Sequence, residues 1–174
     1  MSRTGVIVVD MLHDFIRPDG VLYCGAQSEA IIEPIARRLE QARANRDAVI
    51  YLCDRHRPDD PEFAMFPPHA VAGTPGAEII GELAPEPVDR VIPKRRFSAF
   101  IGTELLLALH ELHVDELELT GVCTNICIQY TACNARDLGY PVTVYVDRVA
   151  TFDPEAHEFA LRQMETVLGV RVIR

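Results

Sequence analysis

The sequence predicts an α/β fold: a doubly wound parallel sheet of about six strands with helices on both faces. Two observations lead to this prediction. Short, continuously apolar runs alternate along the chain with segments whose apolar residues recur at helical spacing. Strands of a parallel sheet are buried on both faces by their crossover helices, so they appear as unbroken apolar runs. The 174 residues suit a single domain, which we expect to span residues 1–174.

Each predicted strand is a short run rich in β-branched residues. The first, Thr4–Val9, contains the apolar run Gly5-Val6-Ile7-Val8-Val9. The others follow at intervals that leave room for a crossover, and they are Ala48–Cys53, Arg90–Pro93, Leu117–Thr120, Val142–Val146 and Val170–Ile173.

Four helices are expected between these strands. Ser28–Ala44 has an apolar stripe and a serine that can cap it. Thr103–His113 is rich in leucine, and Cys123–Leu138 ends at Gly139. The last helix begins at Asp153-Pro154, and its expected buried face comprises Phe159, Ala160, Met164 and Val167.

Composition excludes several classes of function. The net charge of −9 argues against binding to nucleic acid or to an anionic membrane, and no apolar run is long enough to span a bilayer. The chain begins with residues that lead directly into a strand, so we expect no secretory signal. Five cysteines, an odd number, then indicate reduced thiols and a cytoplasmic protein.

Chemically reactive side chains follow four neighbouring strands. Asp10, Asp54 and Lys94 each come at the end of a strand, and Cys123 and Cys127 follow the fourth. The carboxyl ends of parallel strands share one edge of the sheet, where ligands of such folds bind. A cysteine in the first turns of a helix is expected to have a lowered pKa, because the helix dipole favours the thiolate.

These residue types suit nucleophilic catalysis. A carboxylate can take the thiol proton, and an ammonium group can stabilise the charges that develop. Alone, Asp10 would be read as a turn residue, Lys94 as part of a solvated charged edge, and either cysteine as a core residue. The residues themselves leave open which cysteine is the nucleophile.

Three segments resemble the signatures of the isochorismatase-like cysteine hydrolases, in the same order along the chain. They are 8–15 (VVDMLHDF), the segment around Lys94, and 120–128 (TGVCTNICI). The resemblance implies the catalytic triad Asp10, Lys94 and Cys127. It also implies a cis peptide before Cys123, with the backbone N–H groups of Cys123 and Cys127 forming the oxyanion hole. His13 departs from the family, which often has Gln or Asn there.

The loop after the second strand contains two imidazoles and two carboxylates, from Asp54, His56, Glu62 and His69. This set suits a zinc, manganese or iron ion, although a polar surface loop could have the same composition. Together with 66–76 (FPPHAVAGTPG), these residues resemble the metal-binding segment of nicotinamidases. The resemblance implies a divalent metal ion on the four residues, with zinc as the first expectation.

The resemblance to nicotinamidases also implies a substrate, a small-molecule amide. Phe15, Phe66 and Phe97 would enclose a flat heteroaromatic ring, and nicotinamide would be hydrolysed to nicotinate and ammonia through a Cys127 thioester. Relatives of this kind are often homo-oligomers. Two alternatives are a related cysteine hydrolase that acts on another small amide or ureido compound without needing the metal, and a binding module without turnover.

Overall fold

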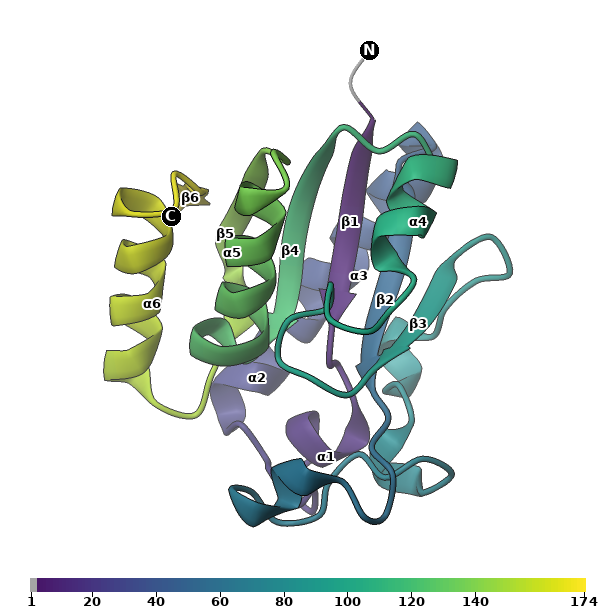
Figure 1. Cartoon of the computed structure of the whole chain (residues 1–174), viewed down its shortest axis with the longest axis vertical. Helices are drawn as coiled ribbons and strands as arrows, with labels where there is room; N and C mark the ends of the chain where they lie inside the picture. Colours follow the sequence, from purple (N-terminus) through teal and green to yellow (C-terminus); the bar gives the residue numbers. More distant parts are fainter. Residues whose placement is uncertain (1–2) are drawn as a thin grey trace.

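A computed structural model describes residues 3–174 and contains one six-stranded sheet, in which every neighbouring pair is parallel (Figure 1). The strand order is β3-β2-β1-β4-β5-β6. The order reverses between β1 and β4, which opens a crevice at the carboxyl ends of these strands. The predicted fold class is confirmed, and the strands are β1 (Thr4–Val9), β2 (Ala48–Asp54), β3 (Arg90–Lys94), β4 (Glu116–Val122), β5 (Val142–Ala150) and β6 (Arg171–Ile173).

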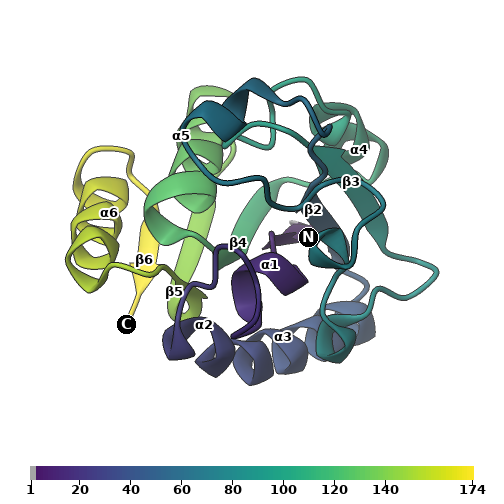
Figure 2. The same ribbon diagram turned by 90° about the horizontal axis from the view of Figure 1, so that it is seen from below.

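Helices cover both faces of the sheet (Figures 1 and 2). Side chains alternate along β1, so Val6 and Val8 pack on one face while Ile7 and Val9 pack on the other. The first face is covered by α1 (His13–Ile16), α2 (Ala26–Ala30) and α3 (Ile32–Asn45). The second face is covered by α4 (Leu105–Glu111), α5 (Gln129–Asp137) and α6 (Pro154–Thr166).

The prediction of one helix over Ser28–Ala44 is wrong, because the chain forms α2 and α3 with a break at Ile31. Pro34 explains the break. Proline has no N–H to donate and its ring clashes with the carbonyl four residues earlier, so it fits only in a first turn. Ser28 lies inside α2, where its hydroxyl donates to the carbonyl of Gly25 and caps nothing.

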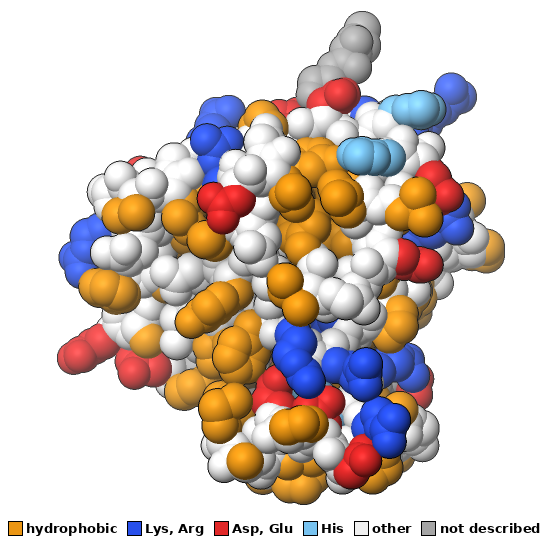
Figure 3. All heavy atoms as spheres, viewed as in Figure 1, with side chains coloured by type: hydrophobic (Ala, Val, Ile, Leu, Met, Phe, Trp, Pro, Cys, Tyr) orange, Lys and Arg blue, Asp and Glu red, His pale blue; other side chains and the backbone are white. Residues whose placement is uncertain are grey.

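Two residues expected on the buried face of the last helix are exposed. Asp153 caps α6 as expected, and Ala160 and Met164 are buried. Phe159 and Val167, however, are 53% and 67% exposed. Phe159 lies one residue off the buried stripe, and Val167 is the C-cap that follows the last residue of the helix. Apolar side chains are scattered among charged ones over the face of the molecule shown in Figure 3.

The predicted helix Cys123–Leu138 begins differently. Cys123 is extended, and the chain first forms a π-helical turn, η4 (Thr124–Ile128), before α5.

The segment between β2 and β3 contains three 3₁₀ turns, η1 (Pro61–Ala64), η2 (Pro75–Ala77) and η3 (Gly81–Leu83). In residues 3–174, no helix is both long enough and apolar enough to cross a membrane.

We expect Gly121→Ala to lower the free energy of unfolding by about 3 kcal/mol or more. Gly121 has φ +108°, and a Cβ there would lie 2.0 Å from the carbonyl oxygen of Val9, its neighbour in the sheet. Gly139→Ala is the matched control, since φ is +89° but no atom lies within 4 Å. That variant should lose only about 1 kcal/mol. Equal losses in urea titrations of the two variants would contradict the steric explanation.

Candidate active site

The ends of four strands bring the predicted reactive side chains together. Asp10 follows β1 in a left-handed conformation with φ 52°, which turns the chain sharply at the sheet edge. Asp54 and Lys94 are the last residues of β2 and β3 and are paired in register. Cys127 lies in the π-helical turn after β4. All four side chains are buried.

Lys94 is the only lysine of the chain, and its ammonium group lies at the centre of this cluster. Its Nζ is 2.7 Å from Oδ2 of Asp10 and 2.7 Å from Oδ1 of Asp54. It also donates to Sγ of Cys127 at 3.4 Å. Burial alone would lower the pKa of Lys94, but the two carboxylates raise it well above the ordinary value. The group is therefore a permanent cation.

The two carboxylates differ in their pKa. Burial and the neighbouring Asp54 raise the pKa of Asp10 to about 6. Burial also opposes ionisation of Asp54, but Lys94 and His56 outweigh it and lower the pKa of that carboxyl group. Oδ1 of Asp10 accepts the backbone N–H of Asp54 at 2.8 Å, which fixes the orientation of the first carboxylate. Asp10 is thus the better proton acceptor of the two.

The expectation of a lowered pKa for the cysteine thiol is wrong for Cys127. Burial raises the pKa of this thiol well above its ordinary value, in spite of the opposing effect of Lys94. A position near a helix start favours the thiolate, but this side chain is removed from water and also faces Asp10 and Asp54. The resting group is a neutral thiol that needs a base.

The structure distinguishes the two cysteines by their contacts. Sγ of Cys127 contacts the ammonium of Lys94, whereas Sγ of Cys123 lies 3.3 Å from Sγ of Cys24. The Val122–Cys123 peptide bond is cis, as the resemblance implies. Contact with Lys94 favours Cys127 as the nucleophile.

A second cluster of buried side chains comprises His56, Glu62 and His69, with Asp54 shared between the clusters. Nε2 of His56 lies 3.5 Å from Oδ2 of Asp54 and 3.8 Å from Oε1 of Glu62. Nε2 of His69 lies 3.9 Å from the same Glu62 oxygen. The ligand atoms of Asp54, His56 and His69 lie within 4.8 Å of one another. These separations suit donors around one ion better than direct hydrogen bonds.

The imidazoles are oriented as metal ligands are. Nδ1 of His69 is 2.8 Å from the carbonyl of Pro67, and Nδ1 of His56 is 3.2 Å from Oδ2 of Asp60. With a proton on Nδ1, each ring turns the lone pair of Nε2 toward the cluster. Among residues 3–174, neither buried ring nitrogen of His56 has a hydrogen-bond partner. The unpaired Nε2, close to the carboxylates of Asp54 and Glu62, fits a divalent ion.

Two aspartates that were not predicted as site residues hold this loop in place. Asp14 is buried, and its Oδ2 accepts the backbone N–H of Ala70 at 2.7 Å, beside His69. Asp60 caps the turn η1 and so positions Glu62. The signal for Asp60 was present, because aspartate before proline is a common start of a helical turn. Nothing local distinguishes Asp14.

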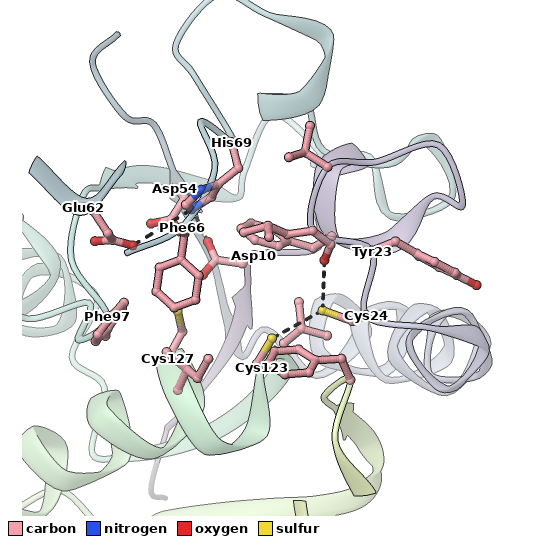
Figure 4. Close-up of a pocket in the computed structure, with 16 residues that line it drawn as sticks. Asp10, Tyr23, Cys24, Asp54, Glu62, Phe66, His69, Phe97, Cys123 and Cys127 are labelled. Carbon is pink, nitrogen blue, oxygen red and sulfur yellow. Dashed lines mark hydrogen bonds and ion pairs between the residues drawn. The ribbon is translucent and has the colours of Figure 1, made fainter. Parts of the chain in front are cut away.

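A cavity of about 400 Å³ connects the two clusters. Asp10, Cys123 and Cys127 line one part, and Asp54, Glu62 and His69 line another (Figure 4). The three predicted phenylalanines also line it, and Phe66 packs edge to face on Phe97 with ring centroids 6.3 Å apart. Other residues of the wall were not predicted, because their local pattern is that of ordinary apolar residues: Val21, Leu22, Tyr23, Cys24, Val122, Ile126 and Phe152.

Residues 4–173 match the isochorismatase domain family. The chain belongs to this family. The crystal structure of nicotinamidase/pyrazinamidase PncA from Bacillus subtilis matches with a TM-score of 0.93 at 35% identity, covering 99% of this chain and 100% of that chain. The crystal structure of the pyrazinamidase/nicotinamidase of Streptococcus mutans UA159 matches with a TM-score of 0.92 at 37% identity, covering 98% of this chain and 99% of that chain. The pyrazinamidase of Pyrococcus horikoshii, in complex with zinc, matches with a TM-score of 0.92 at 27% identity, covering 99% of each chain. The protein is an amidohydrolase that acts on amide carbon–nitrogen bonds.

We expect the protein to bind one equivalent of Zn²⁺, and His69→Ala to weaken binding at least about tenfold. The measurement is isothermal titration with zinc after chelation, with the metal content of dialysed protein as a second readout. His110→Ala is the matched control, since His110 is exposed on α4. Wild-type affinity and stoichiometry in His69→Ala would show that zinc binds elsewhere.

Proposed function

We propose that residues 1–174 form one hydrolase domain that converts nicotinamide to nicotinate and ammonia. The observation that carries the proposal is a single cavity with two chemically distinct parts. One part presents the thiol of Cys127 beside the ammonium of Lys94 and the carboxylate of Asp10. The other presents imidazole and carboxylate groups suited to a metal ion. Such a cavity can position a heteroaromatic ring and attack its carboxamide.

In the first half of the proposed reaction, Asp10 takes the proton of the Cys127 thiol, and the sulfur attacks the amide carbon. A raised pKa makes Asp10 a stronger base than an ordinary carboxylate, and the thiol needs that help because burial raises its own pKa. The carbonyl oxygen becomes an oxyanion held by the N–H groups of Cys123 and Cys127. Asp10 then gives its proton to the nitrogen, and ammonia leaves a thioester on Cys127.

In the second half, Asp10 takes a proton from water, and the resulting hydroxide attacks the thioester carbon. The carbon–sulfur bond breaks, nicotinic acid leaves and loses its proton to become nicotinate, and the proton on Asp10 returns to the sulfur of Cys127. Lys94 keeps its charge throughout, so it compensates in turn the carboxylate of Asp10 and the thiolate. The first proton transfer is short, because the carboxylate of Asp10 and the sulfur of Cys127 lie within 4.8 Å of each other.

Recognition of the ring would involve both clusters. Asp54, His56, Glu62 and His69 would hold a divalent ion, zinc by preference, which would supply a Lewis-acidic partner for the pyridine nitrogen. Phe15, Phe66 and Phe97 line the same cavity and would pack against the faces and edges of the ring.

We expect Cys127→Ala to abolish ammonia release from nicotinamide, a loss of at least about 10⁴-fold in kcat, while the thermal unfolding midpoint changes little. The reason is that Cys127 is the thiol in contact with Lys94, whereas the Cys123 thiol contacts that of Cys24. Cys133→Ala is the matched control, because Cys133 lies on α5 and does not line the cavity. Substantial activity in Cys127→Ala would refute the mechanism.

An amide panel separates nicotinamide from the alternative substrates. We expect zinc-loaded protein to prefer nicotinamide over benzamide, which lacks the ring nitrogen, by at least about 100-fold in kcat/KM. Chelation should remove that preference. Faster turnover of an N-carbamoyl compound, unaffected by chelation, would instead support the related cysteine hydrolase.

A further inference from the structure

Two thiols that the proposed mechanism does not use face each other in the cavity wall. Sγ of Cys24 lies 3.3 Å from Sγ of Cys123, although the residues are 99 positions apart in sequence. Both side chains are buried in the protein but line the cavity. Figure 4 shows their sulfur atoms directed at one another.

We propose that Cys24 and Cys123 are a redox-sensitive pair, which a hydroperoxide that enters the cavity oxidises to a reversible disulfide that suppresses turnover. The sulfur atoms need to approach by about 1.3 Å to reach the length of a disulfide bond. Both residues lie outside regular structure, Cys24 between α1 and α2 and Cys123 between β4 and η4. Small adjustments of such segments can bring the two sulfur atoms together.

The chemistry consumes one hydroperoxide for each disulfide. The sulfur of Cys24 attacks the peroxide oxygen while its thiol proton passes to the departing oxygen, which leaves a sulfenic acid on Cys24 and releases water or an alcohol. The sulfur of Cys123 then attacks that sulfenic sulfur, and its proton leaves with the hydroxyl group as water. Two thiols are oxidised and the O–O bond is reduced. Contact with the Cys24 thiol and burial raise the pKa of the Cys123 thiol, so the first step is assigned to Cys24.

The effect on catalysis rests on the proposed function. Cys123 begins the turn that carries Cys127, and its backbone N–H is one of the two proposed oxyanion donors. Cys24 belongs to the segment between α1 and α2, which also lines the cavity, and its N–H donates to the carbonyl of Phe15. A disulfide would tie these two segments together and shift both the oxyanion donor and the wall beside Phe15.

Disulfide formation is tested first without reference to activity. Cys127→Ser protein is treated with limiting hydrogen peroxide, the remaining thiols are alkylated, and peptides are mapped by mass spectrometry. We expect a cross-linked peptide that joins Cys24 to Cys123 and disappears on addition of dithiothreitol. The matched variant Cys133→Ala in the same background should keep the cross-link, and Cys24→Ala should lose it. Alkylation of both Cys24 and Cys123 after treatment would overturn the proposal.

The regulatory effect is tested with the same treatment of protein that retains Cys127. Ammonia release should fall at least about tenfold and recover with dithiothreitol, whereas Cys24→Ala should keep its own starting rate. An equal loss in Cys24→Ala would assign the inactivation to another thiol and overturn the regulatory effect. If no variant hydrolyses nicotinamide, the proposed function fails, while the peptide map still decides whether the pair forms.

Discussion

The arrangement of the site depends on one buried cation. The ammonium of Lys94 is removed from water and therefore requires opposite charge close by, which Asp10 and Asp54 supply at 2.7 Å each. These three residues stand at the ends of β1, β2 and β3, which are neighbours in the sheet. Charge compensation thus fixes how the three strand ends meet, and the same ammonium contacts the thiol of Cys127.

Asp54 connects this charge cluster with the candidate metal site. Its Oδ1 is the partner of Lys94, while its Oδ2 faces Nε2 of His56 at 3.5 Å. Loss of this one carboxylate would leave a buried cation with a single partner and would also remove a donor to the ion. The two functions of the cavity are therefore coupled, although their other residues come from different segments of the chain.

Strand ends were readable from the sequence because a polar side chain after an apolar run is conspicuous, and parallel topology places such ends together. The helix break at Ile31 also has a signal in the sequence, which is Pro34. The raised pKa of Cys127 could not be predicted from the sequence, because it follows from burial and from charges at the ends of β1, β2 and β3 rather than from the local turn. Contacts between residues far apart in the sequence, such as Cys24 with Cys123 or Asp14 with Ala70, leave no pattern in the local sequence. The resemblance to a family, rather than periodicity, selected Cys127 over Cys123.

The most direct test of the central interaction is a double-mutant cycle between Asp10 and Lys94. The free energy of unfolding is measured in the presence of chelator for wild type, Asp10→Asn, Lys94→Met and the double variant. We expect each single variant to be destabilised and the double variant to recover part of the loss, with a coupling energy of about 2–3 kcal/mol. Single-variant effects that add to within about 0.5 kcal/mol would contradict the account, because the ammonium and the carboxylate would then not depend on each other.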